Sequence, residues 1–405
     1  MQIKKYSDFI LERLGVPEGI VESATRLYDE IINKFKEYPD DKFSDVKHGK
    51  RVGDKLQLTK DIPVNIIISN MNFNKVIFDI NIHFSQRYPQ LDVASWGVAV
   101  PHTAVDGYKL IHDLTNQDLN LKVDFVSQET NKFTDIINYL LDRRSHLIGV
   151  LSHELKHVYD KYMMGQQTLV DIIDYQAWAK TSTGFNELDE FFYSLYLTSQ
   201  AENLVRPSEI AGYIKSSDIT KSEFKEFLEE TKIYKELIRI KKWSYKGLKE
   251  ELLSNIERIR TQFGHIPEDE SDEDVIEVVL NIAYRSLVEK SAEIAEDILD
   301  LNNVIKQLSG RIKEADIDFY NDYIKSRLFK NVDEFFLYWE KKLNFTSESV
   351  IKKIGKLYDM CKDEEVNPLM VKINDRVNGQ CIVNPKLYRE VVISRNIGEK
   401  LKYTK

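Results

Sequence analysis

The chain has 405 residues, of which 42% are hydrophobic and 11% aromatic, and its 57 basic and 66 acidic residues give a formal net charge of -9. This length is too great for one ordinary hydrophobic core and predicts two or three domains, and the composition excludes a disordered chain. The basic residues form no long block that could follow a phosphate backbone, so we expect no nucleic-acid ligand.

Signals for export or membrane insertion are missing from the sequence pattern. The first ten residues, MQIKKYSDFI, lack the apolar run of a signal peptide, and no window approaches 18 uncharged apolar residues. The two cysteines, Cys361 and Cys381, form no C-x-x-C metal clip and show no sign of being a disulfide pair. We therefore expect no membrane partner and a cytoplasmic location.

Residues 1–54 are predicted to be an N-terminal helical segment. Two short amphipathic helices are expected, broken at Gly15 and Pro17, and a polar loop is expected from Tyr38 to Asp54. The second helix has an apolar stripe at three- and four-residue spacing, which predicts one buried face. The stripe consists of Ile20, Ala24, Leu27, Ile31 and Phe35.

From residue 55 to about residue 127 the pattern changes to the two-residue period of strands. Four runs of β-branched and aromatic residues are separated by Asn, Asp, Gly and Pro, which predicts a small, mainly antiparallel sheet and an α+β fold. One face of the run at 77–84 is apolar, so we expect that face to pack and the other to meet solvent or a cleft. The expected strands are Val64–Ile68, Val76–Phe84, Trp96–Val100 and Leu119–Val126.

A long helical pattern then runs from Phe133 to Met164 and ends before Gly165. Apolar residues surround much of its circumference, which predicts a buried helix. Near its end, the run LSHELKHVYD (residues 151–160) contains two histidines four residues apart. Imidazoles on a buried helix need polar partners, and a metal ion is one of these.

The two histidines are His153 and His157, and with Glu154 they form an H-E-x-x-H motif. Side chains at positions i and i+4 of a helix lie one above the other, so both imidazoles can reach one metal ion while Glu154 lies beside it. His146 lies two turns earlier on the same face, where a structural hydrogen bond is the simpler explanation. His83, His102 and His112 are predicted to be surface or loop histidines.

This run resembles the active-site helix of the zincin metallopeptidases, in which apolar residues precede the first histidine and a glutamate follows it. The order of a sheet, the motif helix and further helices is also similar, over roughly residues 60–215. The resemblance implies a zinc hydrolase whose antiparallel edge strand binds the substrate backbone. It also implies that a following helical subdomain supplies the third zinc ligand.

After His157 the chain has no histidine before His265, so a carboxylate is the better candidate for the third ligand and a Glu-zincin is favoured. A helical pattern from residue 191 to residue 214 places Glu202, Arg206 and Glu209 at positions i, i+4 and i+7. The spacing E-x-x-x-R-x-x-E resembles the third-ligand helix of phage-type zincins, in which the first glutamate is the ligand. Glu202 is therefore favoured, and Arg206 would orient it or pair with the other carboxylate.

Alternatives to this ligand set stay open. Glu209 is an alternative ligand, and the same residues also fit an ordinary surface helix with an ion pair. Pro207 is expected to kink or restart the helix, so whether Glu202 and Glu209 share one face stays open. Weaker candidates in the same region are Glu187, Asp189 and Glu190.

Three protein ligands leave zinc an open position for water. Glu154 would then be the general base that takes the proton of this water as it attacks a peptide carbonyl. Asp160 is a candidate hydrogen-bond acceptor for a ligand imidazole. The expected function is that of a zinc-dependent metallopeptidase acting on a protein or peptide. Candidate donors to the oxyanion are Tyr193, Tyr196, Tyr213 and His265.

These patterns divide the chain into the N-terminal segment, a zincin-like metallopeptidase domain at 55–215, a helical domain at 216–365 and an irregular tail at 366–405. The helical domain carries a dense group of aromatic residues that we expect in its core. A loop beginning at Phe263 is expected to be a linker or a lid. The aromatic group consists of Phe335, Phe336, Tyr338 and Trp339.

The opening residues, MQIKKYSDFILE, resemble the starts of hypothetical proteins of large tailed phages. This resemblance implies a phage-encoded protein located in the host cytoplasm or the virion, with self-association through the helical region as a further expectation. The alternative function is that of a virion or interaction protein whose zincin-like domain holds a structural or vestigial metal site. Glu154 favours the enzyme, because a purely structural zinc site would not need it.

Overall fold

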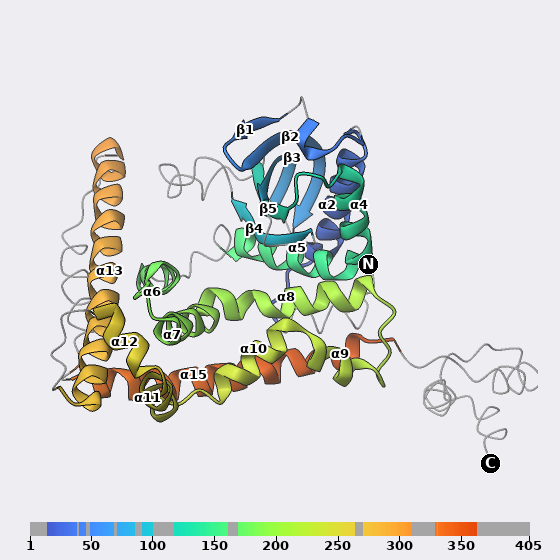
Figure 1. Cartoon of the computed structure of the whole chain (residues 1–405). Coiled ribbons are helices and arrows are strands. Elements are labelled where there is room, and N and C mark those ends of the chain that lie inside the picture. Colours follow the sequence, from blue (N-terminus) through green and yellow to red (C-terminus); the bar gives the residue numbers. More distant parts are fainter. Residues whose placement is uncertain are drawn as a thin grey trace, which may run out of the picture.

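The structure is a computed structural model that describes residues 14–38, 40–45, 49–68, 71–85, 91–99, 117–160, 169–263, 270–309, 329 and 331–362. One mixed sheet and a large set of helices build an α+β fold, as expected (Figure 1). The strands of the sheet are β1 (Lys50–Val52), β2 (Lys55–Ile68), β3 (Met71–Phe84), β4 (Asp92–Ala99) and β5 (Gln117–Ser127).

The sheet has five strands in the order β1-β2-β3-β5-β4. Among the described strands, only β3 and β5 pair in parallel, so the prediction of a mainly antiparallel sheet is confirmed. β2 begins at Lys55 rather than at Val64, and β1 falls within the segment that we predicted as a loop. Pro63 lies at a bulge in β2, where the missing backbone N–H costs least.

One face of the sheet is buried against the helix α2 (Ile20–Phe35). The predicted apolar stripe of α2 is buried along its whole length, and the Phe35 ring meets the edges of two rings on the sheet. The ring centroids are 5.7 Å from Phe78 and 6.2 Å from Phe125. On the opposite face, Asn81 donates a hydrogen bond to Asp124 (2.7 Å), so this face is polar, as the alternation predicts.

Where one long helix was expected, the chain forms α4 (Phe133–Asp142) and α5 (Arg144–Tyr159). The two helices separate at Arg143, whose φ of -112° and ψ of 26° lie outside the helical region. Both helices bury apolar residues under the sheet, and α5 is buried over most of its length.

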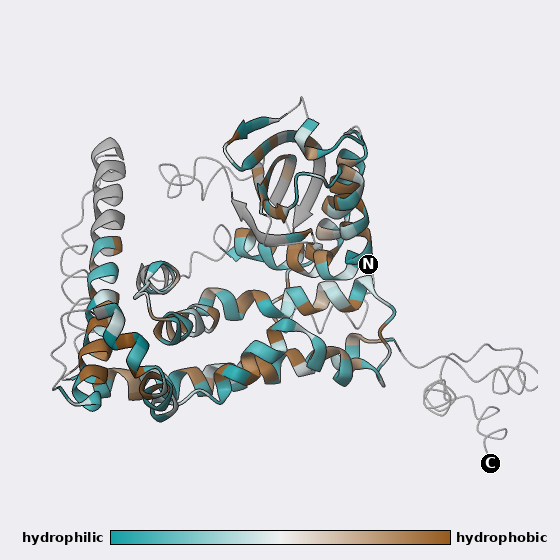
Figure 2. Ribbon diagram, viewed as in Figure 1, coloured by the Kyte–Doolittle hydropathy of each residue, from teal (hydrophilic) through white to brown (hydrophobic). Residues whose placement is uncertain are grey.

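The rest of the described chain is helical, and apolar residues recur along α10 and α15 at the spacing expected for one buried face (Figure 2). Among the described helices, none carries an apolar stretch long enough to cross a membrane. The helices are α6 (Leu169–Lys180), α7 (Asn186–Leu197), α8 (Gln200–Ser216), α9 (Phe224–Glu230), α10 (Lys232–Lys241), α11 (Tyr245–Ser254), α12 (Ile256–Phe263), α13 (Asp272–Ser309) and α15 (Val332–Gly355).

Two hydrophobic cores result from this packing. The sheet core lies between the sheet, α2, α4, α5 and α8, and the helical core lies among α6, α7, α11, α13 and the first half of α15. α10 and α15 contribute to both cores and so connect them. Of the predicted aromatic group, Phe335, Phe336 and Trp339 are buried in the helical core, whereas Tyr338 is 45% exposed.

Two glycines, Gly149 on α5 and Gly212 on α8, let these two helices pack closely together. A Cβ atom on Gly212 would lie 2.8 Å from the Cα of Gly149 and 3.0 Å from the backbone oxygen of Ile148. A Cβ on Gly149 would meet the Tyr213 ring at 2.8 Å. Backbone atoms cannot move aside as flexible side chains do, so any larger residue would push the two helices apart.

We therefore expect Gly212→Ala to destabilise the protein by about 1–3 kcal/mol, because it forces α5 and α8 apart. Gly355→Ala is a matched control, since Gly355 has a right-handed φ of -57° and no atom within 4 Å of an added Cβ. This control should leave stability unchanged or raise it by up to about 1 kcal/mol. Urea unfolding of both variants measures the difference, and equal stabilities would contradict the close-contact account.

Candidate metal centre

Helix α5 presents its two motif histidines on the face that contacts α8. Gly149, His153 and His157 are spaced by four residues, so they lie on successive turns of one face. The close approach at Gly149 thus sets how far the histidines stand from α8. His153 is buried, and the His157 side chain keeps 21% of its surface exposed.

Helix α8 supplies the facing carboxylates. The segment predicted as one helix is divided after Leu197, and Ser199 caps the new helix by accepting a hydrogen bond from the backbone N–H of Glu202 (3.3 Å). This cap fixes Glu202 in the first turn, where the helix dipole favours a carboxylate. The helix does not restart at Pro207, because α8 continues through this residue. Glu202 and Glu209 both contact Arg206 and so lie on one side of α8.

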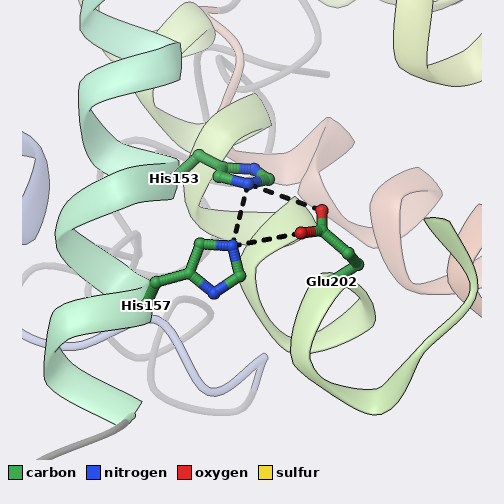
Figure 3. Close-up of side chains that lie close together, drawn as sticks. All are labelled: His153, His157 and Glu202. Carbon is green, nitrogen blue, oxygen red and sulfur yellow. Dashed lines mark hydrogen bonds and ion pairs between the residues drawn. The ribbon is translucent and has the colours of Figure 1, made fainter. Parts of the chain in front are cut away.

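Three side chains converge on one point (Figure 3). The Nε2 atoms of His153 and His157 are 3.1 Å apart, and oxygens of Glu202 lie 3.5 Å and 3.3 Å from them, respectively. With bonds of about 2.0–2.1 Å, two ligand atoms of a tetrahedral zinc ion lie about 3.3–3.4 Å apart. The three separations are close to this value, although His153 faces Oε2 of Glu202 and His157 faces Oε1. The residue types and their spacing therefore fit a zinc ion.

The nitrogen of His153 that faces away from this point is held by Glu209. Its Nδ1 lies 2.8 Å from Oε2 of Glu209, and because a carboxylate only accepts, Nδ1 carries the hydrogen. The lone pair of Nε2 is then directed at Glu202 and His157, as a metal ligand requires. Glu209 therefore orients the His153 ring, which is the role that the sequence suggested for Asp160.

Arg206 joins the two carboxylates. Its guanidinium lies 2.8 Å from Glu202 and 3.2 Å from Glu209, and all three side chains are buried. Two buried carboxylates and one guanidinium leave one net negative charge, which is costly unless a cation accompanies it. Within the described residues, Oε1 of Glu202 makes no hydrogen bond, so this buried oxygen is available to a metal ion.

The pKa values reflect this excess of negative charge. Burial would raise the pKa of Glu202, but the contact with His157 and the charge of Arg206 outweigh burial and hold that pKa below its ordinary value. Burial would lower the pKa of His153, but Glu209 outweighs burial and raises it. The cluster therefore favours a positive charge at its centre, which a proton or a metal ion can supply.

Tyrosines from α6 and α7 lie on another side of the centre. The hydroxyl groups of Tyr175 and Tyr196 are 3.2 Å apart, and the Tyr175 ring centroid lies 6.5 Å from that of His157. Burial, and then the negative charge of Glu202 and of Glu154, raises the pKa of Tyr175 to about 12. Tyr175 thus keeps its proton at neutral pH and can donate a hydrogen bond. No spacing in the sequence marked it.

Several sequence candidates lie away from this centre. Glu187 accepts hydrogen bonds from Arg258 at 2.6 and 2.8 Å, Asp189 accepts one from the backbone N–H of Thr183 at 2.7 Å, and Glu190 pairs with Arg239 at 3.0 Å. Each of these three carboxylates therefore binds a neighbouring group outside the candidate metal centre.

The other candidates also have partners of their own. Asp160 pairs with the buried ammonium of Lys156, and Tyr213 hydrogen-bonds His146. The His83 side chain is 45% exposed and lies 3.7 Å from Asp124 on the sheet, as expected of a surface histidine. Tyr193 stacks on Tyr196. His102, His112 and His265 lie outside the described residues.

Comparison with protein-family models, with curated proteins and with solved structures finds no match to this chain. The assignment of the centre therefore depends on its own geometry and chemistry.

Glu209→Gln should weaken zinc binding by about 10- to 100-fold, because the amide holds the His153 ring less firmly and lowers the negative charge beside it. Competition with a chromogenic chelator measures the zinc affinity. Glu226→Gln on the exposed side of α9 is the matched control and should bind zinc as the parent protein does. Equal affinities of the two variants would contradict the role of Glu209.

Proposed function

We propose that this protein is a zinc-dependent metallopeptidase in which His153, His157 and Glu202 hold the metal ion. The convergence of these three side chains, with the imidazole nitrogens 3.1 Å apart and Glu202 oxygens 3.5 Å and 3.3 Å from them, carries the proposal. Three protein ligands are typical of catalytic zinc sites, since structural sites commonly use four. Glu202 and Glu209 share one guanidinium, that of Arg206, and the net negative charge of this cluster supports a cation at the same point.

Glu154 is the general base in this proposal. It lies on α5 between the two histidines, partly buried, and its charge acts on the Tyr175 hydroxyl near His157. Zinc bound here would lower the pKa of a water molecule towards about 7 and polarise a carbonyl group. Glu154 takes the proton from the attacking water and passes it to the leaving amine. Tyr175 is placed to donate a hydrogen bond to the developing oxyanion.

The sheet supports a peptide as the substrate. β4 is an edge strand of the described sheet, is antiparallel to β5 and contacts α5. A strand edge presents backbone N–H and C=O groups that can pair with an extended peptide. This arrangement agrees with the zincin resemblance of the motif, in which the antiparallel edge strand binds the substrate backbone.

Zinc content and activity of matched variants test the proposal. The parent protein should contain about one zinc per chain and cleave an unfolded, fluorescently labelled protein. Glu154→Gln should keep its zinc and lose about 100-fold or more of the activity, since it retains the shape of the base without its basicity. His157→Ala should lose both zinc and activity.

Two control variants accompany this experiment. His83→Ala removes an imidazole from the sheet, and Glu250→Gln neutralises an exposed carboxylate on α11, so both should keep zinc and activity. A parent protein without stoichiometric zinc would contradict the metal centre. Bound zinc with activity unchanged in Glu154→Gln would contradict the mechanism, and bound zinc without any hydrolysis by the parent would favour a structural site in an interaction protein.

A further inference from the structure

A row of tyrosine rings leads from the surface of the protein to the candidate metal centre. Tyr193 and Tyr196 are three residues apart on α7, so both rings lie on one face of that helix. Their centroids are 6.0 Å apart and their planes are inclined by 21°, which is a stacked arrangement. On α6, the Tyr175 ring lies 5.0 Å from that of Tyr196 and 6.5 Å from that of His157. The row therefore ends at a histidine of the metal centre.

The outer end of this row is open to solvent. Tyr193 is 44% exposed, whereas Tyr196 and Tyr175 are partly buried. Stacking on Tyr196 covers one side of the Tyr193 ring, so the rest of the ring can contact another molecule. Aromatic side chains are enriched where proteins bind partners, because they offer a large and rigid contact area. An exposed ring that continues a row to the metal centre is thus a candidate binding surface.

Charged groups of both signs surround Tyr193. Glu236 lies 3.0 Å from Arg239, and Glu202 lies 2.8 Å from Arg206. Burial raises the pKa of Tyr193; of these four groups, the two carboxylates also raise that pKa and the two guanidiniums lower it. A cationic or an anionic side chain would therefore meet a like charge near Tyr193, whereas a neutral ring would not.

The row lies within reach of a peptide held at the metal centre. Its three ring-to-ring steps, of 6.5, 5.0 and 6.0 Å, lead from His157 to Tyr193. An extended peptide rises about 3.3 Å per residue, so a side chain within about five residues of the bond at the metal can meet Tyr193. Tyr193 can thus contact the same peptide as the metal centre.

We propose that the exposed ring of Tyr193 binds an aromatic side chain of the substrate, a few residues from the bond that is cleaved. This side chain continues the stack of Tyr193 and Tyr196 and gains ring-to-ring contact beyond its burial. The inference rests on the proposed function, because it assigns the row to a peptide held at the metal centre. It makes Tyr193 a residue that selects substrates with an aromatic residue.

Peptide binding to the full-length Glu154→Gln variant tests this inference, because that variant is expected to hold zinc without cleaving the peptide. The probes are fluorescein-labelled octapeptides of alternating alanine and serine, each with one phenylalanine at a different position. Fluorescence polarisation measures their dissociation constants. We expect at least one placement of phenylalanine to tighten binding about 2- to 10-fold over the octapeptide without it. Leucine at the same position should tighten binding less, because it has no ring to stack.

Variants of Tyr193 in the same background identify the surface that the phenylalanine meets. Tyr193→Ala should remove the gain from phenylalanine, and Tyr193→Phe should keep it, because the ring remains. Tyr358→Ala is the matched control, since Tyr358 is 43% exposed but packs on Phe224 of α9, outside the helices that carry the row. This control should keep the full gain. All three variants should hold as much zinc as the Glu154→Gln parent.

Four outcomes would overturn the inference: equal gains from phenylalanine and leucine, a larger gain from arginine, no gain at any position, or an undiminished gain in Tyr193→Ala. Failure of the proposed function gives a different result. If the wild-type protein cleaves no peptide but the gain from phenylalanine depends on Tyr193, the aromatic binding surface is supported and only the peptidase assignment fails. If it cleaves peptides but the gain does not depend on Tyr193, only the aromatic binding surface fails.

Discussion

The close contact of α5 and α8 determines the geometry of the candidate metal centre. Gly149 and Gly212 let the two backbones approach to a distance that no Cβ atom would allow. Because His153 is one turn beyond Gly149 and Glu209 is one turn before Gly212, this contact sets the distance between imidazole and carboxylate. Gly149 and Gly212 therefore determine how close His153 lies to Glu209, although neither glycine can bind a metal ion through a side chain.

The buried charges explain why this arrangement calls for a cation. Glu202 and Glu209 share one guanidinium, and they lie too deep for water to compensate the remaining negative charge. The carboxylate of Glu209 raises the pKa of His153 against the effect of burial, and Oε1 of Glu202 makes no hydrogen bond among the described residues. A metal ion that replaces the proton would satisfy both groups at once. The site would then be organised before substrate arrives.

The sequence predicted those parts of the site in which residues of one helix lie on the same face. Four-residue spacing within one helix brought His153 and His157 together, and the spacing of Glu202 and Glu209 put both on one face of α8. The breaks at Arg143 and Ser199 were missed, because the apolar pattern continues across them while the backbone changes direction. The contact of Tyr175 with Tyr196 joins two helices, and no local spacing encodes such a contact.

Anomalous diffraction at the zinc edge, from crystals of the full-length protein, would locate a bound zinc ion. We expect one strong peak, about 2.0–2.2 Å from Nε2 of His153, Nε2 of His157 and an oxygen of Glu202. Glu209 should contact the Nδ1 atom of His153 and not the peak itself. Absence of a peak at this point in zinc-soaked crystals, or a peak bound by Glu209 in place of Glu202, would contradict the proposed metal centre.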